Sequence, residues 1–413
     1  MTRSLLALAA LSTLTVAPAL ALAQPGAGTL ERVSAFGANP GGLEMHRYTP
    51  SPAPSGPAPV VFALHGCTQN VATFRNTGWE PLADELGFYV VYPAQTSANN
   101  PVSCFNWAGE YGDEANLRRG EGENRSLISM LDRMEADHEV SGAYVMGHSA
   151  GAAMAMVLLS TWPERFEAGG VIAGIPYRCA TSVSGAFSCQ SPGVDRSPME
   201  WASLVRDASP HAGPWPRLSL WHGTNDGIVV PANQREVLDQ WTATLGIGRE
   251  PTATETVDGQ QRQTFSDGGR VLIESWEVAR GGHATFIDPE SGCGATAAYV
   301  SDADICAVRH MAAFFGLSGA PAIPPPRRDA GPATLPDGGP APTPADGGGW
   351  TWADRDGGSP TGPGVDAGGG VVSPDMQHLC GCAAAPGRAP SPWIALPLGL
   401  GLLLFARGRR TLA

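Results

Sequence analysis

Short, unbroken apolar runs recur along the chain and alternate with longer segments of mixed polarity. The clearest runs cover residues 59–64, 88–93, 168–174 and 217–221. A strand that is apolar throughout is buried on both faces, as in a parallel sheet covered by helices on both sides. The pattern therefore predicts an α/β fold with a mostly parallel, doubly wound sheet in a single domain.

The segments between and after these runs carry the periodicity of amphipathic helices. Helices are expected over residues 73–86, 121–138, 233–245 and 303–317. A hairpin is expected over residues 263–279, because two strand-like segments flank an Asp-Gly-Gly turn there.

A further strand runs into a turn built around a serine. Residues 142–160 comprise a short strand, a tight turn at Ser149 and a helix of small and apolar residues. Gly147 and Gly151 bracket the serine in a GxSxG pattern, since a sharp strand-to-helix turn leaves no space for side chains two positions away. This is the setting of a hydrolase nucleophile, and an ordinary Gly/Ser turn is the structural alternative. The N–H of Ala150, at the start of the helix, is placed to stabilise an oxyanion.

Two later loops supply candidates for the rest of a catalytic triad. Asp226 follows the run at 217–221, at the carboxyl end of a strand, where open α/β sheets carry functional groups. Its alternative role is to cap the turn. His283 lies in a glycine-flanked loop after the predicted hairpin. The chain order Ser149, Asp226, His283 is that of nucleophile, acid and base in α/β-hydrolases, so His283 is expected to take the serine proton and Asp226 to orient it.

The loop after residues 59–64 is expected to complete an oxyanion hole through the N–H of Cys67. His65 is expected to fix that turn by hydrogen bonds rather than to act as a base. No catalytic role is assigned to the other histidines near these elements, His148, His222 and His310, of which His222 is expected to pack under the acid loop.

Two tryptophans are candidate apolar contacts for a substrate. Trp107 ends a polar loop that also contains Cys104, and its structural alternative is a satellite core residue. Trp79 is a second, weaker candidate.

The first 23 residues have the features of an export signal. Arg3 precedes an apolar run that ends in a small-x-small cleavage site at residues 21–23. The formal net charge is −13, all 26 basic residues are arginine, and removal of Arg3 makes the charge −14. Nucleic acid and anionic membrane surfaces are therefore poor partners for the folded part. The expected location is secreted, extracellular or anchored at the cell surface.

The cysteines indicate disulfides rather than a metal site. Six lie in the expected folded region, without CxxC spacing or a histidine cluster, so zinc is a poor interpretation and neither a metal nor a cofactor is expected. Six cysteines allow fifteen pairings. Pairing of neighbours in order is favoured, because each bond would then hold one loop beside the proposed site: Cys67 with Cys104, Cys179 with Cys189, and Cys293 with Cys306.

With these residues placed, the region from about Thr29 to Leu317 resembles the extracellular polyhydroxybutyrate depolymerase family of serine esterases, which is close to the feruloyl and acetylxylan esterases. The resemblance is carried by Leu64-His-Gly-Cys-Thr-Gln69, Cys104-Phe-Asn-Trp107, Gly147-His-Ser-Ala-Gly151, Ala173-Gly-Ile-Pro-Tyr177, Trp221-His-Gly-Thr-Asn-Asp226 and Gly282-His283, in the family's order. It implies an α/β-hydrolase catalytic domain over residues 24–319, the triad above, Cys67 as oxyanion donor, and Trp107 at the substrate site.

The C-terminal quarter of the chain has a different composition. Residues 320–376 are rich in Pro, Gly, Asp and Ala with recurring Asp-Gly-Gly, which predicts a disordered linker; calcium loops would need a different ligand spacing. Residues 377–413 combine a cysteine pair, a short apolar segment and a cluster of arginines. This tail resembles the C-terminal surface-sorting signals of myxobacteria, which implies a sorting protease and the membrane as partners.

The sequence thus predicts an exported serine esterase that hydrolyses carboxylic esters through an acyl-enzyme, with hydroxybutyrate or hydroxyalkanoate oligomers as leading substrates. A feruloyl or acetylxylan esterase acting on plant polysaccharide is the alternative within the class. A non-catalytic surface binding protein is the alternative outside it. No polymer-binding domain follows the catalytic one, so soluble or amorphous polyester is the expected form of substrate.

Overall fold

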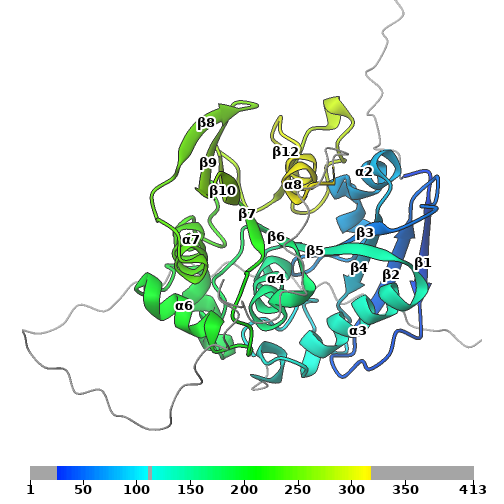
Figure 1. Cartoon of the computed structure of the whole chain (residues 1–413), viewed down its shortest axis with the longest axis horizontal. Coiled ribbons are helices and arrows are strands. Elements are labelled where there is room, and N and C mark those ends of the chain that lie inside the picture. The colour runs from blue at the N-terminus through cyan, green and yellow to red at the C-terminus, as the bar shows by residue number, and fades with distance from the viewer. Residues whose placement is uncertain (1–25, 110–113, 318–413) are drawn as a thin grey trace, which may run out of the picture. The chain divides into compact units, whose positions relative to one another are not determined.

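The computed structural model describes residues 26–109 and 114–317. Six neighbouring strands at the centre of its large sheet pair in parallel, and antiparallel strands extend the sheet on both sides (Figure 1). In spatial order the strands are β1 (Thr29–Val33), β2 (Glu44–Thr49), β4 (Tyr89–Ala94), β3 (Ala58–Leu64), β5 (Val140–His148), β6 (Ala168–Ile172), β7 (Arg217–Gly223), β10 (Arg270–Val278), β9 (Gln260–Asp267) and β8 (Ala253–Val257).

Helices cover both faces of this sheet, as the apolar runs predict (Figure 1). One face carries α3 (Gly122–Asp137), α4 (Ala150–Thr161), α6 (Pro198–Arg206) and α7 (Ala232–Leu245). The other carries α1 (Val71–Phe74), α2 (Trp79–Leu86) and α8 (Ala307–Phe315). Alternate residues of β3 enter the two cores, since Phe62 packs in the first and Val61 in the second. The fold is the expected doubly wound α/β sheet.

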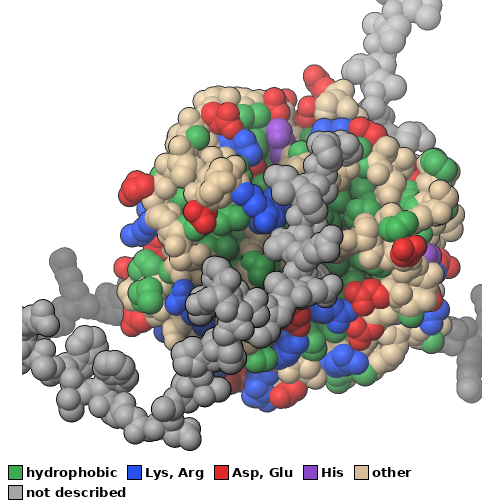
Figure 2. Space-filling view, in the orientation of Figure 1, with side chains coloured by type: hydrophobic (Ala, Val, Ile, Leu, Met, Phe, Trp, Pro, Cys, Tyr) green, Lys and Arg blue, Asp and Glu red, His purple; other side chains and the backbone are tan. Residues whose placement is uncertain are grey.

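The remaining elements are short. Helix α5 (Val183–Gln190) follows β6, and a separate two-stranded parallel sheet pairs β11 (Thr285–Ile287) with β12 (Val300–Asp302). Single 3₁₀ turns cover Arg75–Thr77, Glu114–Leu117, Pro163–Arg165 and Pro289–Ser291. On the surface, acidic and basic side chains are interspersed on the face drawn in Figure 2.

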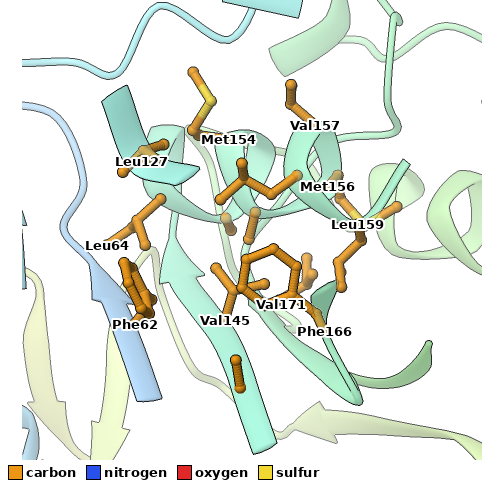
Figure 3. Close-up of a cluster of buried hydrophobic side chains, with 14 of the residues drawn as sticks. Phe62, Leu64, Leu127, Val145, Met154, Met156, Val157, Leu159, Phe166 and Val171 are labelled. Atoms are coloured by element: carbon orange, nitrogen blue, oxygen red, sulfur yellow. The ribbon is translucent and has the colours of Figure 1, made fainter. Parts of the chain in front are cut away.

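Helix α4 is buried along its whole length, from Ala150 to Thr161. In Figure 3 its Met154 and Val157 stand above Val145 of β5, with Leu127 of α3 beside them. A helix that is apolar all round is held by contacts on every side. The first turn of α4, which follows Ser149, is therefore fixed relative to the sheet.

Two helix predictions need correction. The helix expected over residues 73–86 is interrupted at Gly78, whose φ of 97° lies in the left-handed region. The last helix begins at Ala307 rather than at 303, because the residues before it include Asp304 with a φ of 54°.

Trp79 is not a substrate contact. Its side chain is fully buried, edge-on to Phe88 at 6.0 Å and stacked with Phe315 at 6.4 Å between ring centroids. The prediction was wrong because an apolar residue at the start of a helix can be covered by an element far away in the sequence, here α8.

Among the described residues, three disulfide bonds join the neighbours expected: Cys67 with Cys104, Cys179 with Cys189, and Cys293 with Cys306. The first ties the loop after β3 to the loop after β4. Within the part of the chain described, no helix has the length and hydropathy needed to span a bilayer. The predicted export signal, linker and sorting tail lie outside the described residues.

Candidate active site

Ser149 stands at a strained turn between β5 and α4. Its φ of 55° and ψ of −120° are outside the regions that non-glycine residues normally occupy. Hydrogen bonds hold the turn on both sides, from the Ser149 N–H to the Ile172 carbonyl at 2.9 Å and from the Ala153 N–H to the Ser149 carbonyl at 2.9 Å. Strain of this kind exposes the hydroxyl of a nucleophile elbow.

The two glycines of the motif are required by crowding, as the sequence predicts. A Cβ on Gly147 would overlap the backbone of Gly151, and a Cβ on Gly151 would overlap the carbonyl oxygen of Leu64. Both obstacles are backbone atoms, which cannot rotate away. The chain can therefore pass from β5 into α4 beside β3 only with glycine at both positions.

Asp226 and His283 lie on loops that follow two adjacent parallel strands, β7 and β10. Backbone hydrogen bonds join these loops, from Thr224 N–H to the Val278 carbonyl at 3.0 Å and from Asn225 N–H to the Gly281 carbonyl at 2.9 Å. The loops thus bring together two residues 57 positions apart, and His283 Nδ1 lies 2.7 Å from Asp226 Oδ2. A hydrogen bond at that nitrogen leaves Nε2 as the free nitrogen of the ring.

The Asp226 carboxylate is buried and surrounded by donors. Its Oδ1 accepts hydrogen bonds from the N–H groups of Ile228 at 2.9 Å and Val229 at 3.0 Å. Burial by itself would raise the pKa of Asp226, but hydrogen bonds with His222 and His283 outweigh it and hold the pKa below the usual range. Asp226 is therefore ionised at neutral pH and can stabilise a positive charge on His283.

His222 packs beneath this loop, as expected, with Nε2 2.8 Å from the Val229 carbonyl and 3.4 Å from Asp226 Oδ2. The nitrogen donates to the carbonyl, so His222 supports the acid loop. The turn-capping alternative for Asp226 is present as well, because Oδ1 caps the turn while Oδ2 faces His283.

The predicted oxyanion donors flank the elbow. Ala150 is the first residue of α4, and Cys67 lies on the loop after β3. Within the described ranges neither backbone N–H donates to another protein group. Gly66, in the same loop, packs closely against the elbow, since a Cβ there would meet His148 Nδ1 at 2.9 Å, and its N–H donates to Gln69 Oε1 at 2.8 Å. Two free donors at this edge can bind one oxygen that gains negative charge.

His65 fixes the oxyanion loop through both ring nitrogens. Nδ1 lies 2.8 Å from the Gly66 carbonyl, and Nε2 accepts from the Gln95 N–H at 3.1 Å. Burial lowers the pKa of His65 to about 4. A charged ring could not accept the Gln95 hydrogen bond, so His65 serves as a neutral structural support, as expected.

Trp107 is nearly covered, with 5% of its surface exposed. It belongs to a third apolar cluster that also contains Ile175, Val229 and Ala150, the first residue of α4. The Cys67–Cys104 bond ties its loop to the oxyanion loop. Both expected roles, substrate contact and satellite core residue, remain compatible with this position.

Two rings beside His283 have no role in the sequence-based interpretation. His148 is 1% exposed, and its ring centroid lies 4.7 Å from that of His283. Burial, and then the nearby His283, hold the pKa of His148 well below the usual range. Tyr299 lies 5.9 Å from His283 in an edge-to-face arrangement. The adjacency of His148 to Ser149 could have indicated the first contact, whereas no motif marks Tyr299.

The described residues contain no group of three or more His, Cys, Asp and Glu side chains arranged to hold a metal ion.

Comparison with known proteins identifies the family. Residues 43–260, which include Ser149 and Asp226, match the family model described as esterase PHB depolymerase. This chain belongs to that family. The chain is 43% identical to poly(3-hydroxyalkanoate) depolymerase C of Paucimonas lemoignei over 307 residues, which make up 73% of each chain. As a member of the PHB depolymerase family, the protein is a serine ester hydrolase.

An acetylxylan esterase and a feruloyl esterase are less similar relatives of this PHB depolymerase family member. The chain is 33% identical to an acetylxylan esterase of Coprinopsis cinerea over 64% of this chain and 71% of the other. It is 30% identical to feruloyl esterase B of Talaromyces stipitatus over 62% of this chain and 72% of the other. The solved acetyl xylan esterase from Aspergillus awamori, at 24% identity and a TM-score of 0.59, covers 70% of this chain and 100% of its own, which supports the α/β-hydrolase fold.

Proposed function

We propose that this protein is an exported esterase that cleaves hydroxyalkanoate esters, with Ser149 as nucleophile, His283 as base and Asp226 as the acid that orients it. The observation that carries this proposal is the 2.7 Å contact between His283 and Asp226 on the loops after β7 and β10. These loops follow parallel strands of the sheet that also leads into Ser149, so all three side chains lie at its carboxyl edge.

In this mechanism His283 Nε2 takes the proton of Ser149 Oγ as the oxygen attacks the ester carbonyl carbon. The N–H groups of Cys67 and Ala150 stabilise the oxyanion. The carbon–oxygen bond to the alcohol then breaks, and His283 gives its proton to the leaving oxygen. Water, activated by the same histidine, hydrolyses the acyl-enzyme and releases the acid. Asp226 remains ionised throughout.

The surface around the site favours an apolar ester over a polysaccharide. Three of the exposed large apolar side chains of the described residues lie beside the site: Val102, Ile228 and Tyr299, whose ring meets that of His283. The Val102 carbonyl accepts a hydrogen bond from Thr68 N–H at 2.7 Å, next to the oxyanion loop, and Ile228 is two residues from Asp226. Such side chains suit the methyl-bearing backbone of a hydroxyalkanoate better than a hydroxyl-rich xylan chain.

A feruloyl or acetylxylan esterase is the second candidate, supported by the relatives of those names at 30% and 33% identity. Both candidates use the same triad, so the difference lies in the pocket for the acyl and alcohol groups.

Export and anchoring form part of the proposal. Three disulfides in the folded part fit an oxidising compartment, and the signal-like residues 1–23 provide the route. We assign residues 320–376 to a linker and residues 377–413 to a sorting tail, whose partners would be a sorting protease and the membrane.

A substrate panel tests the proposal. Hydroxybutyrate dimer and trimer, amorphous and crystalline polyhydroxybutyrate, acetylated xylan and methyl ferulate are compared at equal enzyme concentration, with Ser149→Ala as blank. The expected result is the highest kcat/KM on the soluble oligomers, measurable release from amorphous polyester and little from crystalline film. A higher kcat/KM on acetylated xylan or methyl ferulate would assign the protein to the second candidate. If the protein hydrolyses none of these esters, the result would favour the alternative of a non-catalytic surface binding protein.

A further inference from the structure

Tyr299 is an exposed aromatic residue at the edge of the catalytic histidine. It is 37% exposed, whereas the side chain of His283 is only 7% exposed. The two rings meet edge to face, at 78° and 5.9 Å between centroids. The fully buried His148 contacts His283 as well, at 4.7 Å. Of the two rings, only Tyr299 can also contact a molecule that enters from solvent.

The backbone holds Tyr299 in an unfavourable conformation. Its φ of 58° lies in the left-handed region, which is rare for a bulky side chain. Two hydrogen bonds between Ala297 and Val300, each of 3.0 Å, close the tight turn that contains it. The N–H of Thr285, two residues after His283, donates to the Tyr299 carbonyl at 2.9 Å. Strain maintained by several contacts beside a reactive group is typical of functional positions.

The same turn is connected to the oxyanion loop. Gln69 Nε2 donates to the Ala298 carbonyl at 2.7 Å, while Gln69 Oε1 accepts from the Gly66 N–H at 2.8 Å. One side chain therefore links the loop of Cys67 to the residue before Tyr299. The ring is placed relative to both the base and the oxyanion donors.

We propose that Tyr299 forms the wall of the leaving-group subsite and selects the alcohol part of the ester. The inference rests on the triad of the proposed function. During acylation His283 carries the proton from Ser149 to the oxygen of the departing alcohol, so that oxygen must lie beside the His283 ring. A substituent on it then extends past the ring that borders His283, which is Tyr299. The phenol offers an apolar face for the methyl and methylene groups of a hydroxyalkanoate and a hydroxyl for its carboxylate or next ester.

The test varies the alcohol while the acyl group stays constant. Methyl 3-hydroxybutyrate and the 3-hydroxybutyrate dimer both transfer a 3-hydroxybutyryl group to Ser149, but the first releases methanol and the second releases 3-hydroxybutyrate. Because kcat/KM reports the steps up to the acyl-enzyme, it is sensitive to the leaving group. Tyr299→Ala is expected to lower kcat/KM for the dimer about tenfold, the effect of losing one apolar contact, and for the methyl ester by less than about twofold.

Two further variants separate the ring from the fold. Tyr299→Gly removes the ring and relieves the left-handed strain, so it should keep or raise Tm while reproducing the selective loss on the dimer. Tyr299→Phe should retain the dimer activity if the ring face dominates. Met199→Ala, which removes another exposed apolar side chain, on α6, serves as the control and should leave kcat/KM unchanged for both esters.

The outcomes distinguish this inference from the proposed function. An equal loss on both esters in Tyr299→Ala and Tyr299→Gly would overturn the leaving-group assignment and show that the ring only orients His283. Unchanged kcat/KM on both esters would overturn it as well. Esterase activity that survives in Ser149→Ala would instead refute the triad itself, whatever the behaviour of the Tyr299 variants.

Discussion

The parallel centre of the sheet and its antiparallel flanks are built on different principles. Strands β4 and β6 are buried at every residue, whereas β1 and β8 on the two edges contain no buried residue. The loops that carry Ser149, Asp226 and His283 all follow strands of the parallel centre. The centre gains its stability from apolar burial, and so its carboxyl edge can hold strained and charged groups.

The flanks depend more on paired charges. In one flank Arg47 of β2 faces Glu31 of β1, with Nε 2.9 Å from Oε1. In the other, Arg262 of β9 faces Glu255 of β8 at 2.6 Å. Cross-strand ion pairs contribute only about 0.2–1 kcal/mol each. The comparison therefore predicts large effects for substitutions in the centre and at its edge, and small ones in the flanks.

The largest effect is expected for the catalytic base. His283→Ala should lower kcat by about 10⁴ to 10⁶, because members of one triad act as a unit. His310→Ala is the matched control, since this histidine on α8 pairs with Asp258 at 2.9 Å and should change kcat less than about twofold. Steady-state kinetics with a soluble hydroxybutyrate ester measures both. Wild-type turnover in His283→Ala would show that another residue is the base.

Asp226→Asn is expected to lower kcat by about 10⁴, because the amide favours the wrong tautomer of His283. A loss smaller than about tenfold, in protein with an unchanged Tm, would mean that the carboxylate is structural and mainly caps its turn through Oδ1.

The next effect is a difference in folding stability between a substitution in the parallel centre and one in a flank. Leu220→Ala in β7 removes a side chain that is 1% exposed and should lower the free energy of unfolding by about 2–5 kcal/mol. Thr256→Ala, on the exposed strand β8, should change it by about 0.5 kcal/mol or less. Urea unfolding followed by tryptophan fluorescence compares the two. Equal losses would contradict the distinction between centre and flank.

A smaller effect is expected from pH. The pKa of His65 is about 4 in the folded protein and ordinarily 6.5, so between these values the unfolded chain binds more protons. The contribution of neutral His65 to the free energy of unfolding is therefore present in full above pH 6.5 and is lost as the pH falls toward 4. Between pH 8 and pH 5 the loss from this group is about 2 kcal/mol. His65→Gln, which cannot be protonated, should lose that much less over the same range. Parallel pH curves for the two proteins would rule out a neutral, buried His65.

The smallest effect is expected for the flank ion pairs. A double-mutant cycle on Glu31 and Arg47 should give a coupling energy of about 0.2–1 kcal/mol that falls with added salt. The cycle on Glu255 and Arg262 should give a similar value. A coupling above about 2 kcal/mol would show that the flanks depend on charge more than surface pairs usually allow.

The same contrast explains how much the sequence could predict. β3, β4, β6 and β7 were predictable because burial on both faces requires unbroken apolar runs. β1, β2 and β8 were not, because half-exposed strands such as Glu44–Thr49 carry a polar pattern that also fits a loop. The hairpin of β9 and β10 was confirmed through its glycine turn.

For the candidate site, motifs located Ser149, Asp226 and His283, since each needs glycine or turn residues nearby in the sequence. Tyr299 could not be predicted, because it reaches His283 only through the pairing of β11 with β12 and a turn without a motif. Trp79 was misplaced for a related reason, since the ring of Phe315 that covers it belongs to α8.

The central claim, that Ser149 is the nucleophile activated by His283, can be tested most directly by covalent labelling. The folded enzyme is incubated with a serine-directed fluorophosphonate, and the adduct is located by peptide mass spectrometry. The account predicts one label per chain on Ser149, loss of esterase activity in proportion to labelling, no label in Ser149→Ala, and labelling in His283→Ala slowed by several orders of magnitude. A label on another serine that abolishes activity, or full activity in protein labelled at Ser149, would contradict it.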